Sequence, residues 1–127
     1  MIFRLDYTHI LFPDPSLAEE DGLLAVGGDL SRDRLLNAYA NGIFPWYSDD
    51  TPILWYAPHE RFVLYPSEVK VSKSMVKVIS KGDFVITYNK AFRAVIQNCA
   101  SINRKEQDGT WIVDDMQKEF PEYIKKV

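Results

Sequence analysis

Two tryptophans lie in short motifs that contain glycine or proline, and both could bind a planar ligand. Trp46 belongs to GIFPWYS at residues 42–48, and Trp111 belongs to DGTWI at 108–112. An indole on a proline-stiffened loop can stack on a nucleobase, which is worth about 1–3 kcal/mol per base. The alternative for each residue is packing over a small core. The residues alone leave both interpretations open.

A group of lysines provides a second candidate site, which would suit phosphate. Residues 70–81 contain four lysines and no acidic residue, although the chain has a net charge of −3. On a helix, Lys73, Lys77 and Lys81 fall within an arc of about 80°. Local potential guides a polyanion to its site, so these lysines could contact nucleic-acid phosphates, or they could form an ordinary solvated face. The opposite side of the helix would consist of Met75, Val76, Val78 and Ile79.

Few other residues are candidates for metal ligands, nucleophiles or general bases. His9 and His59 are far apart, and no His/Asp/Glu cluster has ligand spacing, so we predict no metal. Cys99 is the only cysteine, and its place on an apolar helix face predicts a core residue rather than a nucleophile. The sequence GGD at 27–29 is neither a dinucleotide motif nor a P-loop and predicts a turn into a helix. No residue indicates a general base or an activated nucleophile.

These candidates must be positioned by short helices and strands. Capping residues and apolar spacing predict helices at about residues 32–41, from Ser72 to the residue before Gly82, and after Asn89. The third helix would present Phe92, Val95, Ile96 and Cys99 on one face. A last helix would present Met116, Phe120, Ile124 and Val127. Strands are expected at 61–65 and 84–88, and the proline-rich stretch 42–58 is expected to be irregular.

The order of elements predicts an α+β fold, or the opening of a mixed α/β domain. Hydrophobic residues make up 46% and aromatic residues 13% of the 127 residues, which predicts a packed core and argues against disorder. No stretch approaches the roughly 18 apolar residues of a membrane span, and no signal peptide is evident. We therefore expect a cytoplasmic protein. The last helix has no partner strands after it, so we expect a fragment or a shortened form.

Several motifs, in this order, resemble the leucyl/phenylalanyl-tRNA–protein transferase family. They are GLLAVGGDL at residues 22–30, LLNAYANGIFPWYS at 35–48 and PILWYAPHERFVL at 52–64. The likeness continues through SKSM at 72–75, NCAS at 98–101 and GTWI at 109–112, and so covers nearly the whole chain.

The resemblance implies an activity and its partners. Members of this family take Leu or Phe from aminoacyl-tRNA and attach it to proteins that begin with Arg or Lys, as a degradation signal of the bacterial N-end rule. The resemblance also implies that Trp46 and Trp111 flank the 3′-terminal adenine of the tRNA. It places Lys73, Lys77 and Lys81 under the acceptor stem. The aminoacyl ester is already activated, so no metal, CoA or other cofactor is expected. We expect a monomer without a membrane partner.

The resemblance also implies a domain organisation. Residues 1–63 would form a small N-terminal subdomain, and 64–127 an incomplete acetyltransferase-like (GNAT) domain. The amino-acid pocket and the catalytic groups are expected beyond residue 127, so we expect no transfer by these residues alone. A non-catalytic tRNA- or RNA-binding fragment is one alternative. The other is a CoA-dependent acyltransferase, which usually needs a glycine-rich turn between a strand and a helix to bind pyrophosphate. We expect no such turn after a strand here.

Overall fold

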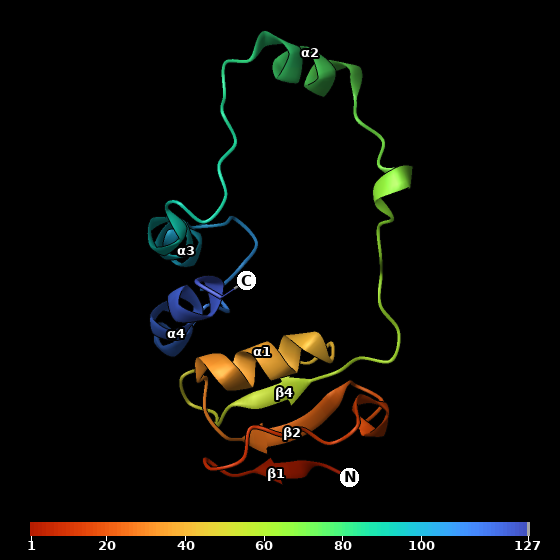
Figure 1. Ribbon diagram of the computed structural model, residues 1–127, viewed down its shortest axis with the longest axis vertical. Helices are drawn as coiled ribbons and strands as arrows, with labels where there is room; N and C mark the ends of the chain where they lie inside the picture. Colours follow the sequence, from red (N-terminus) through yellow and green to blue (C-terminus); the bar gives the residue numbers. More distant parts are fainter. Residues whose placement is uncertain (127) are drawn as a thin grey trace.

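A small mixed sheet forms the base of the molecule in the computed structural model, which describes residues 1–126 (Figure 1). Its strands are β1 (Phe3–Leu5), β2 (Leu23–Gly27), β3 (Phe44–Pro45) and β4 (Leu54–Tyr56), in the order β1-β2-β4-β3. β1 and β2 are parallel, whereas β2, β4 and β3 pair antiparallel. The chain thus combines a mixed sheet with helices, as predicted, and the stretch 42–58 contains two very short strands.

Helix α1 (Arg32–Ala40) covers one face of this sheet, where the sequence predicted a helix. Its buried Leu35 and Ala38 pack in one cluster with Leu24 of β2 and Trp55 of β4. The indole N–H of Trp55 donates to the backbone oxygen of Gly27 at 2.9 Å, so this ring is fixed in the core. A short 3₁₀ helix, η1 (Pro15–Leu17), lies in the connection between β1 and β2.

Two further helices extend the core beyond α1. α3 (Phe92–Ser101) packs against α4 (Asp114–Ile124), and α4 packs against α1. Ile96, Met116 and Phe120 are buried, as their spacing predicted. Ile124 is partly buried, and Val127, expected on the same face, lies outside the described residues.

Residues 61–91 form an arm that leaves the sheet after β4 and returns at α3 (Figure 1). It contains a second 3₁₀ helix, η2 (Pro66–Glu68), and α2 (Lys73–Lys81) at its far end. α2 begins after Ser72, whose hydroxyl accepts from the Met75 N–H at 3.2 Å, and ends at left-handed Gly82, as predicted. Every residue of the arm is exposed, including the apolar side of α2.

Four expectations for the second half of the chain are wrong. Residues 61–65 and 84–88 form no strands, because no described segment pairs with them and an isolated strand leaves its hydrogen bonds unmade. Asn89 adopts a left-handed φ of 58°, so α3 begins after Ala91 instead. Cys99 is exposed rather than buried, because α3 packs only one narrow side, around Ile96, against α4.

No helix within residues 1–126 is long and apolar enough to cross a membrane.

Candidate functional site

Trp46 is held at the end of β3 by the sheet. Its backbone N–H donates to the Leu54 oxygen at 2.9 Å, which continues the pairing of β3 with β4. The ring lies 5.9 Å from that of Tyr56 between centroids, at an angle of 57°. The preceding Pro45 is buried, whereas 57% of Trp46 is exposed. The motif therefore anchors its proline in the core and presents the indole to solvent.

Trp111 is held by the segment that leads into α4. Gly109 adopts a φ of 79°, a left-handed conformation that a residue with a side chain rarely adopts. The Thr110 hydroxyl then accepts from the Ile112 N–H at 3.1 Å, and Ile112 and Val113 are buried. Trp111, between these fixed residues, is 46% exposed. Neither tryptophan is therefore fully exposed to solvent, and neither belongs to the buried core.

The structure brings the two tryptophans to one cleft. A cavity of about 370 Å³ is lined by Phe44, Pro45, Trp46, Gln107 and Trp111. A second cavity, of about 450 Å³, has Trp46, Gln107 and Trp111 among its lining residues, together with Ser48 and Tyr56. We call these adjoining cavities the tryptophan cleft. Ligand pockets span about 300–1,000 Å³, so each has room for a small planar group such as a nucleobase.

Tyr47 lines the larger of the two cavities and packs against the hydrophobic core. Its hydroxyl is buried and has no hydrogen-bond partner within residues 1–126. Burial raises the pKa of the Tyr47 hydroxyl to about 12, and the carboxylates of Asp115 and Asp49 add to the shift. The phenolate is disfavoured here because it would lie in a poorly hydrated place beside two negative charges.

This pKa predicts a loss of stability at alkaline pH. Above about pH 10 the unfolded chain loses the Tyr47 proton while the folded chain keeps it, so the free energy of unfolding should fall towards about pH 12. Tyr47→Phe should make that fall shallower. Urea unfolding from pH 9 to pH 11.5 measures it, with Tyr7→Phe, at an exposed position, as the control. Equal pH slopes for wild type and Tyr47→Phe would contradict this account of the site.

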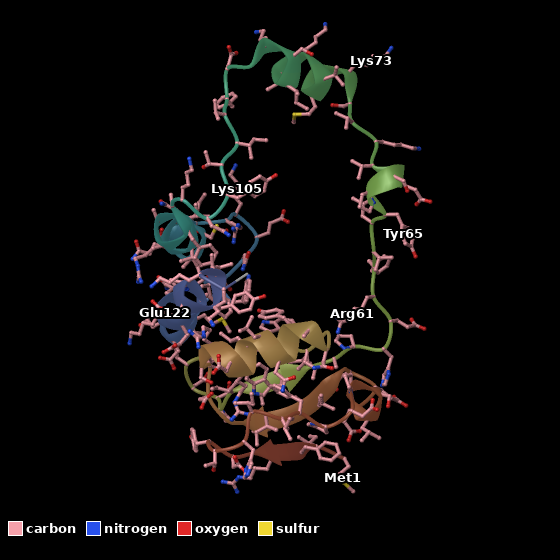
Figure 2. All side chains as sticks on the ribbon, in the orientation of Figure 1. Met1, Arg61, Tyr65, Lys73, Lys105 and Glu122 are labelled. Carbon is pink, nitrogen blue, oxygen red and sulfur yellow. The ribbon has the colours of Figure 1, made fainter. Side chains whose placement is uncertain are left out.

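The lysines lie apart from the tryptophan cleft. Lys73, Lys77 and Lys81 are exposed on α2 and line neither of its cavities. Figure 2 places Lys73 at the far end of the arm from Arg61. Arg61, at the base of the arm, donates to the Gly42 oxygen and lies over the Phe44 ring at 5.7 Å. The structure therefore holds two separate candidate surfaces, one aromatic and one basic.

The glycine-rich turn at residues 27–29 contradicts the expectation that no such turn follows a strand. It does follow a strand, β2, and precede a helix, α1, whereas we expected no strand before it. Its space is filled: a methyl group on Gly28 would come within 3.0 Å of the Arg34 guanidinium. Asp29 accepts from the Arg34 Nε at 3.1 Å and from the Ser31 N–H at 3.0 Å. The Asp29–Arg34 ion pair thus fills this turn with the chain's own side chains.

The remaining polar groups near the site are carboxylates and hydroxyls in exposed turns. Within the described part of the chain, no group of three His, Cys, Asp or Glu residues could hold a metal. Ser48 donates to Asp50 at 2.6 Å in an exposed turn, and this bond lowers the pKa of the Asp50 carboxyl. Sequence reasoning missed Gln107, Phe44 and Tyr56 as cleft residues. Phe44 lies within the Trp46 motif and Gln107 directly precedes the Trp111 motif, which was the available signal for these two; Tyr56 lies in neither motif and gave no such signal.

Comparison with known proteins gives matches along most of the chain. Residues 28–59 match the family model of the leucyl/phenylalanyl-tRNA protein transferase N-terminal domain, and residues 63–126 match that of the leucyl/phenylalanyl-tRNA protein transferase. A protein of that name from Anaeromyxobacter sp. (strain Fw109-5) is 56% identical over 115 residues, which are 91% of this chain and 48% of the relative.

Proteins of the same name from other bacteria are similarly close in sequence to this chain. Proteins of the same name from Syntrophus aciditrophicus (strain SB) and Oleidesulfovibrio alaskensis (strain ATCC BAA-1058 / DSM 17464 / G20) are 57% and 59% identical. The matches cover 87% and 83% of this chain, and 46% and 42% of those relatives. The chain thus spans about half the length of the curated relatives it matches.

Proposed function

Because this chain belongs to the leucyl/phenylalanyl-tRNA protein transferase family, we propose that its tryptophan cleft binds the 3′-terminal adenosine of an aminoacyl-tRNA. The observation that carries the proposal is that Trp46 and Trp111 line the same cavities. Two half-exposed indoles on rigid supports can hold a base by stacking, and every base offers a flat face to them. The proposed reaction moves Leu or Phe from tRNA onto proteins that begin with Arg or Lys.

The proposed reaction needs little chemistry from the protein. The neutral α-amine of the acceptor attacks the carbonyl carbon of the aminoacyl ester. A peptide bond forms, the ester bond to the ribose breaks, and the amine proton passes to the ribose oxygen that leaves. An α-amine has an ordinary pKa of about 7.7–8.0, so much of it is neutral near pH 8. Holding amine and ester together can then supply most of the rate. In this scheme the cleft fixes one end of the ester.

We assign the basic face of α2 to the tRNA backbone. Lys73, Lys77 and Lys81 are exposed on a helix that carries no acidic residue, which suits duplex phosphates. We also propose that residues 1–63 form an N-terminal subdomain, and that 64–127 belong to an acetyltransferase-like domain. The division falls at the start of the exposed arm. α4, which follows the division in the sequence, packs against α1, which precedes it.

The experiment compares two tRNAs that differ only at the 3′ end. One carries the complete CCA end and the other lacks the terminal adenosine. We expect the complete tRNA to bind this chain about 5- to 150-fold more tightly, the equivalent of stacking one base. Filter binding at fixed salt measures both dissociation constants. Equal affinity would show that the terminal adenosine has no site here, and binding would then rest on phosphates alone.

A further inference from the structure

One hydrogen-bonding side chain lies between the aromatic rings of the tryptophan cleft. Gln107 lines both cavities, as Trp46 and Trp111 do. The other residues around the smaller cavity are Phe44 and Pro45, which offer no side-chain hydrogen bond. The indoles can only donate, from one N–H each. Among the described residues that line the smaller cavity, Gln107 is therefore the one whose side chain both donates and accepts hydrogen bonds.

The loop holds Gln107 in place through its backbone and leaves its amide free. The Gln107 N–H donates to the Arg104 oxygen at 3.3 Å, and these two residues form an isolated antiparallel bridge. Two residues later, Gly109 turns the chain towards Trp111. The Gln107 side chain is exposed and makes no hydrogen bond to another group within residues 1–126. A ligand in the cleft could therefore form hydrogen bonds with both the NH₂ group and the oxygen of this amide.

We propose that Gln107 recognises the edge of the adenine that stacks in the cleft, an inference that rests on the proposed function. A glutamine amide can pair with adenine twice, because its oxygen accepts from the N6 amino group and its NH₂ donates to N7. Hypoxanthine and guanine carry an oxygen at position 6 in place of the amino group. Against them the NH₂ still finds an acceptor, but the amide oxygen faces another acceptor. Stacking would hold any base, and Gln107 would select adenine.

The test uses two trinucleotides, CCA and the same RNA with inosine in place of the last adenosine. Their binding is measured by quenching of tryptophan fluorescence, since Trp46 and Trp111 are half-exposed and Trp55 is buried. We expect wild type to prefer the adenosine end by about 5- to 150-fold. Gln107→Leu should bind both ends alike, at about the wild-type affinity for inosine, because the stacking surfaces remain.

Two further variants keep the result interpretable. Gln107→Asn retains the amide but shortens its reach, so it should lower the preference for adenosine and still fold if Gln107→Leu does not. Glu106→Gln changes the neighbouring exposed residue, which lines neither cavity, and should keep the wild-type preference. Circular dichroism checks each fold.

The outcomes separate this inference from the proposed function. If wild type binds both ends equally well, or if folded Gln107→Leu keeps the wild-type preference, Gln107 does not select the base, while the stacking site stands. If wild type binds neither end, the tryptophan cleft is not a base site, and both proposals fail.

Discussion

Trp46→Ala and Trp111→Ala are each expected to weaken binding of the CCA trinucleotide by about 5- to 150-fold, which corresponds to about 1–3 kcal/mol of lost stacking. Each change removes one wall of the cleft, since both rings line both cavities. The losses should not simply add, because a base that has lost one stacking partner can shift against the other. Isothermal titration measures these affinities without depending on tryptophan fluorescence.

The controls are Trp46→Phe and Trp111→Phe. A phenyl ring keeps a stacking face, so these variants should retain more affinity than the alanine variants. Both tryptophans are about half-exposed, so none of the four changes should unfold a core that is built around Trp55 and Leu35. If the alanine variants fold and bind CCA as tightly as wild type, the two rings do not form a base site.

The second large effect concerns the salt dependence of tRNA binding. If Lys73, Lys77 and Lys81 meet about three duplex phosphates, they contribute about −2.7 to the slope of log affinity against log salt. Changing all three to alanine should flatten the slope by that amount. It should weaken different tRNAs alike, because phosphate contacts carry no sequence information. Between 50 and 200 mM salt, the lysine contribution amounts to a loss of about 40-fold in wild type.

The controls separate a lost contact from a lost helix or a changed net charge. α2 should survive the triple change, since alanine is a good helix former and Lys73 lies in the first turn, where the helix dipole disfavours a cation. Circular dichroism follows the helix content. Lys118→Ala with Lys126→Ala removes two exposed charges outside the arm and should alter the slope less. An unchanged slope in the folded triple variant would make these lysines an ordinary solvated face.

The helices could be predicted from the sequence because their signals are local. α1 follows Ser31 and ends before Gly42, and α2 follows a Ser72 cap and ends at Gly82. A strand depends on partners that can be distant in the chain, which local patterns do not reveal. The β-branched and aromatic residues at 61–65 and 84–88 therefore suggested strands, yet they run unpaired along the arm. The strands β1, β3 and β4, of two or three residues each, were too short to show a period.

The types of residue that form the site could be predicted from the sequence, but their arrangement in space could not. The motifs around Trp46 and Trp111 indicated rings on loops, and the resemblance implied that they flank one base. Only the fold shows that β3 and the segment before α4 bring them to shared cavities. Gln107 could not be found in this way, because a polar residue in a polar loop is ordinary until its neighbours are known. The roles of all three residues, and of the arm lysines, remain predictions.

The most direct test of the tryptophan cleft is the NMR spectrum of its indole N–H groups. The chain has three tryptophans, of which Trp46 and Trp111 line the cleft and Trp55 is buried in the core. On titration with CCA, we predict that the Trp46 and Trp111 signals shift together along one binding curve, as expected for rings on either side of one base. The Trp55 signal, whose N–H is bonded to the Gly27 oxygen, should stay in place. Saturable CCA binding that leaves both cleft signals unmoved would contradict the proposed site.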